Sequence, residues 1–126
     1  AECYLVGHPA PFAESVKRAN LYREAGADCL FVPGLRDIAT IGALVREVDG
    51  PVSVVMGLSG PPLSVSELGN VGVRRISIGG SLARATFGLV RRAAREILDH
   101  GTFGYAAGQI PDAELCRLFS GAGEST

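Results

Sequence analysis

What is scarce in this 126-residue chain already excludes several classes of protein. The formal net charge is only −1, so no basic or acidic excess favours a nucleic acid or an anionic membrane as partner. The longest purely apolar runs span only a few residues, whereas a membrane-spanning helix needs roughly 18. Hydrophobic residues still make up 47% of the chain, which is typical of a globular domain with a buried core. We therefore expect a cytoplasmic protein with neither a nucleic-acid nor a membrane partner.

Cysteine and histidine are also few, and their spacing is unfavourable for metal or disulfide chemistry. Three cysteines, Cys3, Cys29 and Cys116, lie far apart, which excludes a disulfide framework and a thiolate metal site. Cys29 is expected to be a small core residue. Neither His8 nor His100 has a second ligand at metal-binding spacing. The chain also lacks a recognisable Ser/His/Asp combination, so its residues predict no nucleophilic catalysis.

What the chain does contain is an alternation of apolar strands and amphipathic helices. Apolar segments predict strands within 27–32, 51–57 and 73–78, and AECYLV at the beginning of the chain looks like the end of a fourth. Periodic apolar residues predict helices over about 12–22, 38–48, 64–69, 82–98 and 111–119. Asp37 is placed as an N-cap, and Ser64 with Glu67 has the pattern of a capping box.

This alternation predicts an α/β fold with a parallel sheet, either doubly wound or a segment of a barrel. A closed (β/α)8 barrel typically needs about 250 residues, so about four strands correspond to half of one. We expect one partial domain over 1–126: a half-barrel over about 1–100, a C-terminal helical extension over about 101–120 and a frayed tail at 121–126. Because Ala1 opens directly onto a strand-like segment, we also expect the chain to be part of a longer protein.

The turn Gly79-Gly80-Ser81 is the strongest local candidate for a ligand site. It lies between a strand and the beginning of a helix, where backbone N–H groups can bind an anion such as phosphate. The alternative is that the glycines only permit the turn. Ser53 and Ser77 lie within strands, where hydroxyls usually satisfy a neighbouring backbone group.

The long helix over 82–98 carries several arginines. Glu96 and Asp99 accompany them, so the arrangement is most simply a solvated face. The four arginines in question are Arg84, Arg91, Arg92 and Arg95.

Three segments taken together resemble the C-terminal half of the isocitrate lyase and phosphoenolpyruvate mutase family. They are RANLYREAGADCLFVPG at 18–34, PVSVVMG at 51–57 and LGNVGVRRISIGGSLARA at 68–85. The order and spacing of the segments carry the resemblance, which runs from Ala1 to about Phe119. It implies a (β/α)8 barrel enzyme that uses Mg²⁺ to hold an α-keto acid or its enolate and that breaks or forms C–C or P–C bonds.

The resemblance also implies which site residues the chain holds. In that family the acidic metal ligands and the catalytic loop belong to the N-terminal half, so no catalytic residue and no Mg²⁺ ligand is expected here. The substrate-carboxylate arginine of the family would fall immediately before Ala1. The substrate-binding positions at strand ends correspond to Glu2, Phe31, Pro33, Val55, Gly57 and Gly80.

Three of these positions depart from the lyase branch of the family. Members similar to methylisocitrate lyase have a carboxylate at the position of Pro33, an amide at Val55 and a hydroxyl at Gly57. Loss of these polar groups implies a smaller or less charged substrate than methylisocitrate.

Two functions therefore stay open. The chain is expected to be a fragment, inactive alone, of a Mg²⁺-dependent lyase or mutase that acts on a small α-keto or 2-hydroxy carboxylate. The alternative is a non-catalytic α/β module that binds a phosphorylated ligand at Gly79-Gly80-Ser81 or acts in assembly. The resemblance further implies a homo-oligomer, with the helix at 111–119 exchanged between subunits.

Overall fold

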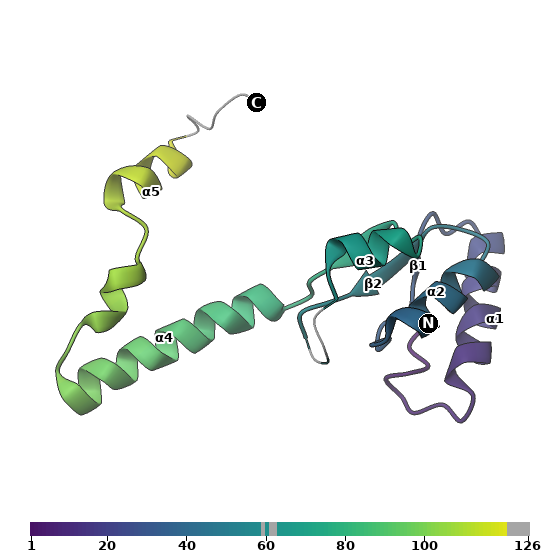
Figure 1. The fold of residues 1–126 in the computed structure, drawn as a ribbon, viewed down its shortest axis with the longest axis horizontal. Helices are drawn as coiled ribbons and strands as arrows, with labels where there is room; N and C mark the ends of the chain where they lie inside the picture. Colours follow the sequence, from purple (N-terminus) through teal and green to yellow (C-terminus); the bar gives the residue numbers. More distant parts are fainter. Residues whose placement is uncertain (59, 61–62, 121–126) are drawn as a thin grey trace. The chain divides into compact units, whose positions relative to one another are not determined.

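The computed structural model describes residues 1–58, 60 and 63–120 of the chain (Figure 1). Contacts divide the chain into two units, Ala1–Leu82 and Ala83–Thr126. The first unit holds the sheet and three helices, and the second holds most of a long helix and the helical segments that follow it. The expected arrangement as one partial domain stays a prediction, and the tail at 121–126 lies outside the described residues.

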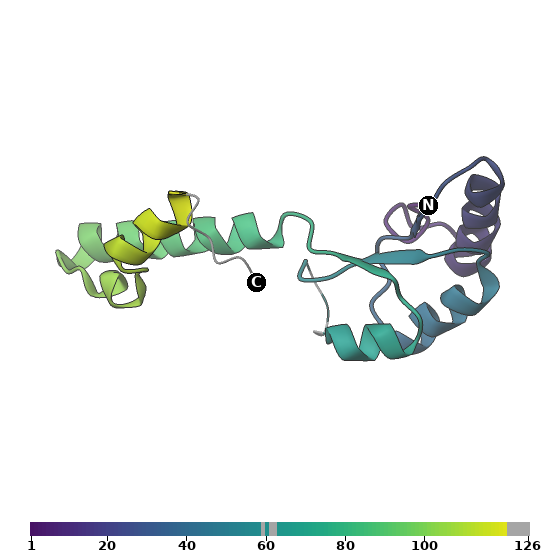
Figure 2. The same ribbon diagram turned by 90° about the horizontal axis from the view of Figure 1, so that it is seen from above.

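The first unit contains a parallel three-stranded sheet in the order β1-β2-β3. Its strands are β1 (Leu30–Phe31), β2 (Val52–Val55) and β3 (Arg75–Ser77). Its helices are α1 (Pro11–Glu24), α2 (Ile38–Glu47) and α3 (Val65–Asn70). Helices α2 and α3 form the two crossovers between neighbouring strands and lie on the same side of them (Figure 2). The predicted strand–helix alternation is confirmed.

The core of this unit lies between the helices and one face of the sheet. Leu30 and Val32 are buried against the helices, whereas the side chain of Phe31 between them is 41% exposed. Successive side chains of a strand point to opposite faces, so the face that carries Phe31 is left uncovered at β1. The core residues contributed by the other elements are Ala19, Leu35, Ile41, Leu44, Val48, Val52, Val54, Leu68 and Val73.

The same alternation corrects the prediction for Cys29. The sequence analysis places it in the core, but its side chain is exposed. Because Leu30 and Val32 use the buried face of this segment, Cys29 and Phe31 point to the opposite one.

Both predicted helix caps are present. The backbone N–H of Thr40 donates to Asp37 Oδ1 at 2.8 Å, which satisfies a free donor at the beginning of α2. At α3 the Glu67 N–H donates to Ser64 Oγ at 3.1 Å, and the Ser64 N–H donates to Glu67 Oε2 at 2.8 Å. These two bonds complete the capping box.

The predicted fourth strand at the beginning of the chain is wrong. The N–H groups of Leu5 and Val6 donate to the Glu2 carbonyl at 3.0 and 3.2 Å, so they form turns. Donors used in turns are not available for a strand ladder. The Ala1 amino group does lie beside β1, where it donates to the Phe31 carbonyl at 2.8 Å. The sheet therefore has three strands in the part of the chain that the structure describes.

The second unit consists of helical segments with exposed surfaces. Helix α4 (Ser81–His100), which begins at the end of the first unit, is followed by the short 3₁₀ helix η1 (Gly104–Gly108) and by α5 (Asp112–Phe119). No residue of these three elements is buried. The two α-helices were predicted, whereas η1 was not.

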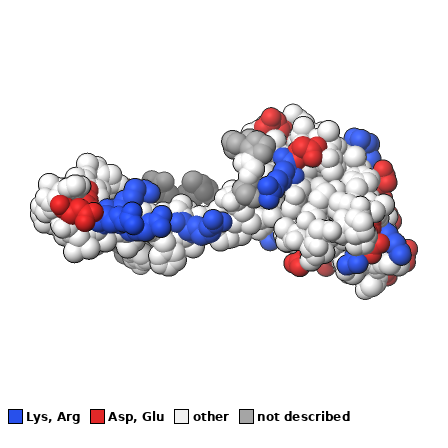
Figure 3. Space-filling view, turned by 90° about the horizontal axis from the view of Figure 1, so that it is seen from below, with Lys and Arg blue, Asp and Glu red and all other residues white. Residues whose placement is uncertain are grey.

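Basic side chains form a row along one face of this unit (Figure 3). All four arginines that the sequence analysis assigned to α4 are exposed, which agrees with a solvated face. Among the described residues, no helix is both long and apolar enough to cross a membrane.

Candidate functional site

The carboxyl ends of the three parallel strands meet at one edge of the sheet, and a small cavity lies there. It has a volume of about 80 Å³. Its lining consists of Leu5, Pro33, Gly34, Leu35, Arg36, Val55 and Leu58. Pro33 follows β1 and Val55 ends β2, so two of the predicted substrate-binding residues come together. The lining is mostly apolar, with the guanidinium of Arg36 as its charged group.

Gly57 lies next to this cavity, against the beginning of α4. It has a φ of +79°, and a Cβ atom built on it would lie 2.9 Å from Ser81 Oγ. The space for a side chain at position 57 is therefore already taken by the Ser81 hydroxyl. This contact gives a physical reason for glycine where methylisocitrate lyase-like sequences are expected to carry a hydroxyl.

Gly80 lies in the turn after β3, in a different environment. A Cβ atom at this position would meet nothing within 4 Å, so glycine is not required there by packing. Two neighbouring backbone donors are already used: the Gly79 N–H donates to Ser77 Oγ at 3.2 Å, and the Ser81 N–H donates to the Ile78 carbonyl at 3.1 Å. Fewer donors are thus left for an anion than the sequence suggests, which weakens the phosphate-binding alternative.

The two remaining predicted residues lie outside the lining of the strand-end cavity. Phe31 is on the uncovered face of β1. Glu2 is exposed and follows Ala1, whose amino group donates to the Phe31 carbonyl. The structure therefore joins Pro33 and Val55 in one cavity and places Gly57 beside them, but it does not gather all six positions into one pocket.

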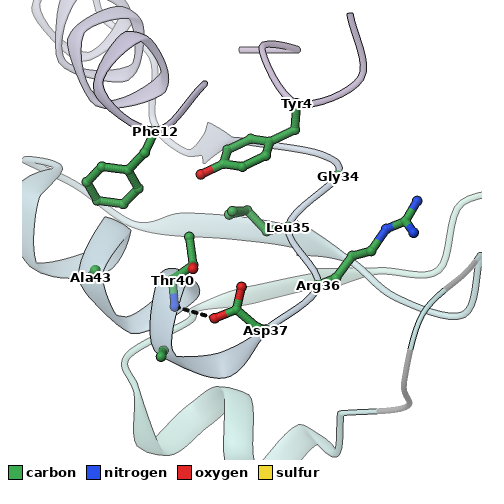
Figure 4. A pocket seen from close by; sticks show the side chains of 9 residues that line it. Tyr4, Phe12, Gly34, Leu35, Arg36, Asp37, Thr40 and Ala43 are labelled. Atoms are coloured by element: carbon green, nitrogen blue, oxygen red, sulfur yellow. Dashed lines mark hydrogen bonds between the residues drawn. The ribbon is translucent and has the colours of Figure 1, made fainter. Parts of the chain in front are cut away.

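A larger cavity of about 580 Å³ lies between the N-terminal segment, α1 and the beginning of α2 (Figure 4). Its lining residues are Tyr4, Phe12, Gly34, Leu35, Arg36, Asp37, Ala39, Thr40 and Ala43. This cavity was not predicted, because its walls come from segments about 30 residues apart in the sequence and carry no recognisable motif.

The ionisable side chains of this larger cavity do not make an acid–base pair. The pKa of Asp37 is lowered, chiefly by the backbone hydrogen bond from Thr40, so its carboxylate serves α2 as a cap. The pKa of Tyr4 is raised, first by burial and then by the charges of Asp37 and Cys3. The phenol is therefore protonated at neutral pH. These protonation states give the larger cavity no paired acid and base for proton transfer.

A polar contact on the face of the sheet that carries Phe31 was also missed. The sequence analysis expected the hydroxyl of Ser53 to satisfy backbone, but Ser53 Oγ accepts a hydrogen bond from Arg75 Nη1 at 2.9 Å. The two residues are 22 positions apart, and only the β2–β3 register brings them together.

The described residues do not make a magnesium site of their own. Within 1–58, 60 and 63–120 there is no group of three or more His, Cys, Asp or Glu side chains placed to hold a metal ion.

Comparison with known proteins identifies the family. Residues 1–98 match the family model described as phosphoenolpyruvate phosphomutase. A solved structure from Burkholderia cenocepacia J2315, provisionally named a lyase/mutase, is 44% identical with a TM-score of 0.89 and covers 94% of this chain and 42% of that one. This similarity confirms the predicted fold class, part of a (β/α)8 barrel.

Two curated relatives extend the comparison. An uncharacterized protein of Mycobacterium tuberculosis (strain H37Rv) is 33% identical over 98 residues, which are 78% of this chain and 37% of the relative. The 2-methylisocitrate lyase of Aeropyrum pernix is 30% identical over 93 residues, which are 72% of this chain and 30% of that enzyme. The chain thus spans only about a third of the curated relatives it matches. The match over 1–98 confirms the family expected from the sequence: the chain belongs to the phosphoenolpyruvate phosphomutase family.

Proposed function

We propose that this chain is part of a Mg²⁺-dependent lyase or mutase that breaks or forms a C–C or P–C bond in a small α-keto or 2-hydroxy carboxylate. The observation that carries the proposal is the meeting of Pro33 and Val55 in a cavity at the strand ends of a chain that belongs to this family. In (β/α)8 barrels the carboxyl ends of the strands are where active sites form.

The shape of this cavity supports a small substrate. Pro33, Val55 and Leu58 line it with carbon atoms, and Gly57 cannot carry a side chain without displacing Ser81. These three side chains exclude water from one side of a bound acid and offer it no hydrogen bond, which leaves the Arg36 guanidinium as the charged group of the lining. This lining therefore favours a substrate smaller or less charged than methylisocitrate.

The metal in this proposal would be held by residues outside the set described here. When bound, Mg²⁺ stabilises the negative charge that develops on an enolate oxygen. The described residues would contribute the wall against which the substrate lies and the positions of the strand ends.

A pair of matched substitutions tests the proposal. Val55→Phe fills the strand-end cavity, whereas Val90→Phe makes the same chemical change on the exposed surface of α4, where Val90 is 58% exposed. We expect pyruvate or oxaloacetate, titrated by calorimetry, to bind wild type and Val90→Phe equally, and Val55→Phe at least about tenfold more weakly.

Two results would count against the proposal. One is equal binding by Val55→Phe and wild type, which would remove the carboxylate from this cavity. The other is tighter binding of a phosphate ester that is lost on replacing Gly80 with a bulky residue, because it would favour the non-catalytic module.

A further inference from the structure

A row of three side chains crosses the face of the sheet that carries Phe31, and its middle residue, Ser53, is buried. The register pairs Phe31 with Ser53 and Ser53 with Arg75. Residues in register on neighbouring parallel strands point to the same face, and the 2.9 Å hydrogen bond from Arg75 Nη1 to Ser53 Oγ agrees with this. Each of the three strands thus contributes one side chain to the row.

The guanidinium in this row has donors to spare. Arginine carries five N–H donors, and one of those on Arg75 is engaged by Ser53. In the described part of the chain no carboxylate lies within salt-bridge distance of Arg75. The ion pair that the described residues do form joins Arg18 and Glu14 in α1. Arg75 is exposed, while the Ser53 that holds it is only 1% exposed. A charged group is therefore anchored on a buried hydroxyl, with no carboxylate at ion-pair distance among the described residues.

The row lies one step before the strand ends: Ser53 precedes Val55 on β2, and Arg75 lies beside Ser53 on β3, which contributes no residue to the lining of the cavity. Val55 pairs with Ser77 in the register, and each lies two residues further along its strand than Ser53 and Arg75. Two residues of a strand span about 7 Å and bring the side chain back to the same face. A small molecule bound near Val55 thus has the Arg75 guanidinium in the next row of the same face.

We propose that Arg75, positioned by Ser53, binds the carboxylate of a small organic acid on this face of the sheet. The inference rests on the proposed function and names a residue that recognises its substrate class. Arginine suits this role because its planar fork can donate two parallel hydrogen bonds to one carboxylate. Ser53 acts as a positioning residue, because its bond to Nη1 restricts the rotation of the guanidinium.

The site also gives the apolar cavity a source of charge recognition. The positions of Pro33, Val55 and Gly57 offer no polar side chain, so the strand ends alone would bind a carboxylate poorly. Among the lining residues only Arg36 carries a positive charge. Arg75, one row below, adds a second guanidinium on this face.

Arg74 provides a matched control for the test. It is the neighbouring residue, lies just before β3 and is also exposed, but it does not belong to the row. Arg74→Gln and Arg75→Gln therefore remove the same charge from adjacent positions. Ser53→Ala and Arg75→Lys are milder changes: the first releases the guanidinium, and the second keeps the charge but removes the fork.

The experiment titrates oxalate, pyruvate and inorganic phosphate into each purified chain without Mg²⁺. Calorimetry gives the affinity, and the NMR signal of the Arg75 Nε–H group reports contact with the ligand. We expect Arg75→Gln to raise the Kd for oxalate at least about tenfold, Ser53→Ala and Arg75→Lys to raise it about threefold or more, and Arg74→Gln to leave it within about twofold. Thermal unfolding of each variant checks the fold. If Arg75→Gln does not fold, the affinities of Arg75→Lys and Ser53→Ala decide whether the inference holds.

Several outcomes would overturn the inference. The first is that Arg74→Gln and Arg75→Gln weaken oxalate binding equally. The second is that neither oxalate nor pyruvate binds the wild-type chain. The third is that phosphate binds more tightly than oxalate and that its binding depends on Arg75. Binding that Val55→Phe weakens but Arg75→Gln does not would reject the role of Arg75 alone and leave the proposed function in place. If the Arg75 dependence is found but Val55→Phe binds normally, only the placement in the strand-end cavity is lost.

Discussion

At the scale of single residues, the most constrained position is Gly34, just after β1. Its φ is +94°, and a Cβ atom there would lie 2.8 Å from the Cβ of Tyr4. Neither atom can move without moving backbone, so the contact cannot be relieved by a change of rotamer.

We predict that Gly34→Ala lowers the free energy of unfolding by about 1–3 kcal/mol. Gly80→Ala is the control, because nothing lies within 4 Å of a Cβ atom at that position and its φ is not in the left-handed region. Urea denaturation followed by circular dichroism measures both. Equal stability of the two variants would show that Tyr4 does not approach Gly34 as described.

A second prediction concerns Ser15 in α1. Its side chain is fully buried, and Oγ has no hydrogen-bond partner among the residues that the structure describes. An unsatisfied buried hydroxyl is costly, so Ser15→Ala should raise the free energy of unfolding by about 1 kcal/mol. The same change at the exposed Ser66 of α3 should alter it by less than about 0.5 kcal/mol. Destabilisation by Ser15→Ala would mean that the hydroxyl does have a partner.

At the scale of elements, local signals predicted helices better than strands. The Asp37 cap and the Ser64–Glu67 box depend on residues three positions apart, so the sequence contains the whole interaction. The expected strand over residues 1–6 failed because pairing also depends on a distant partner strand, and there Leu5 and Val6 use their N–H groups in turns instead. For the same reason the contact between Ser53 and Arg75 and the larger cavity beside Tyr4 could not be predicted.

The connection between α4 and η1 is held by one carboxylate. Glu96 accepts hydrogen bonds from Thr102 Oγ1 at 2.8 Å and from the N–H groups of Gly104 and Tyr105 at 2.5 and 3.0 Å. The first bond, followed by that from Gly104, lowers the pKa of Glu96 below its ordinary value. A lowered pKa in the folded chain means that this stabilisation is fully present above the ordinary pKa of about 4.5 and is lost as the pH falls through the folded value.

We therefore predict that the Gly104 and Tyr105 amides exchange faster with solvent as the pH falls below about 4.5, after correction for intrinsic exchange. Glu96→Gln should remove most of this pH dependence and raise exchange at neutral pH. Asp99→Asn, which removes a charge three residues away, should leave the dependence in place. Unchanged exchange across this pH range in wild type would show that Glu96 does not hold η1.

At the scale of the whole molecule, large apolar side chains stay exposed in both units. In the second unit Phe87 is 72% exposed, Leu98 82% and Phe119 84%. Side chains of this size that are exposed together usually mark an interaction surface. In the first unit, Phe31 on the uncovered face of β1 is a further exposed apolar side chain that a partner could cover.

We predict that the isolated chain self-associates at micromolar concentration, as a homo-oligomer that involves α5 or as less ordered aggregates. Sedimentation velocity should show an average mass that rises with concentration. Leu98→Glu and Phe119→Glu should lower that mass, whereas Val6→Glu, at a residue 70% exposed in the first unit, should change it less. A single sharp monomer boundary at all concentrations, with cooperative unfolding, would contradict this.

The central claim is that the chain supplies a carboxylate-binding part of a lyase or mutase but not its catalytic residues. The most direct measurement is one proton NMR experiment on the chain with Mg²⁺ and oxaloacetate, which reports the Val55 methyl signals and the amount of substrate together. We predict that the Val55 signals shift when oxaloacetate is added. The concentration of oxaloacetate should fall no faster than it does in a protein-free solution. Rapid turnover by the isolated chain, or Val55 signals that do not move at millimolar acid, would contradict the claim.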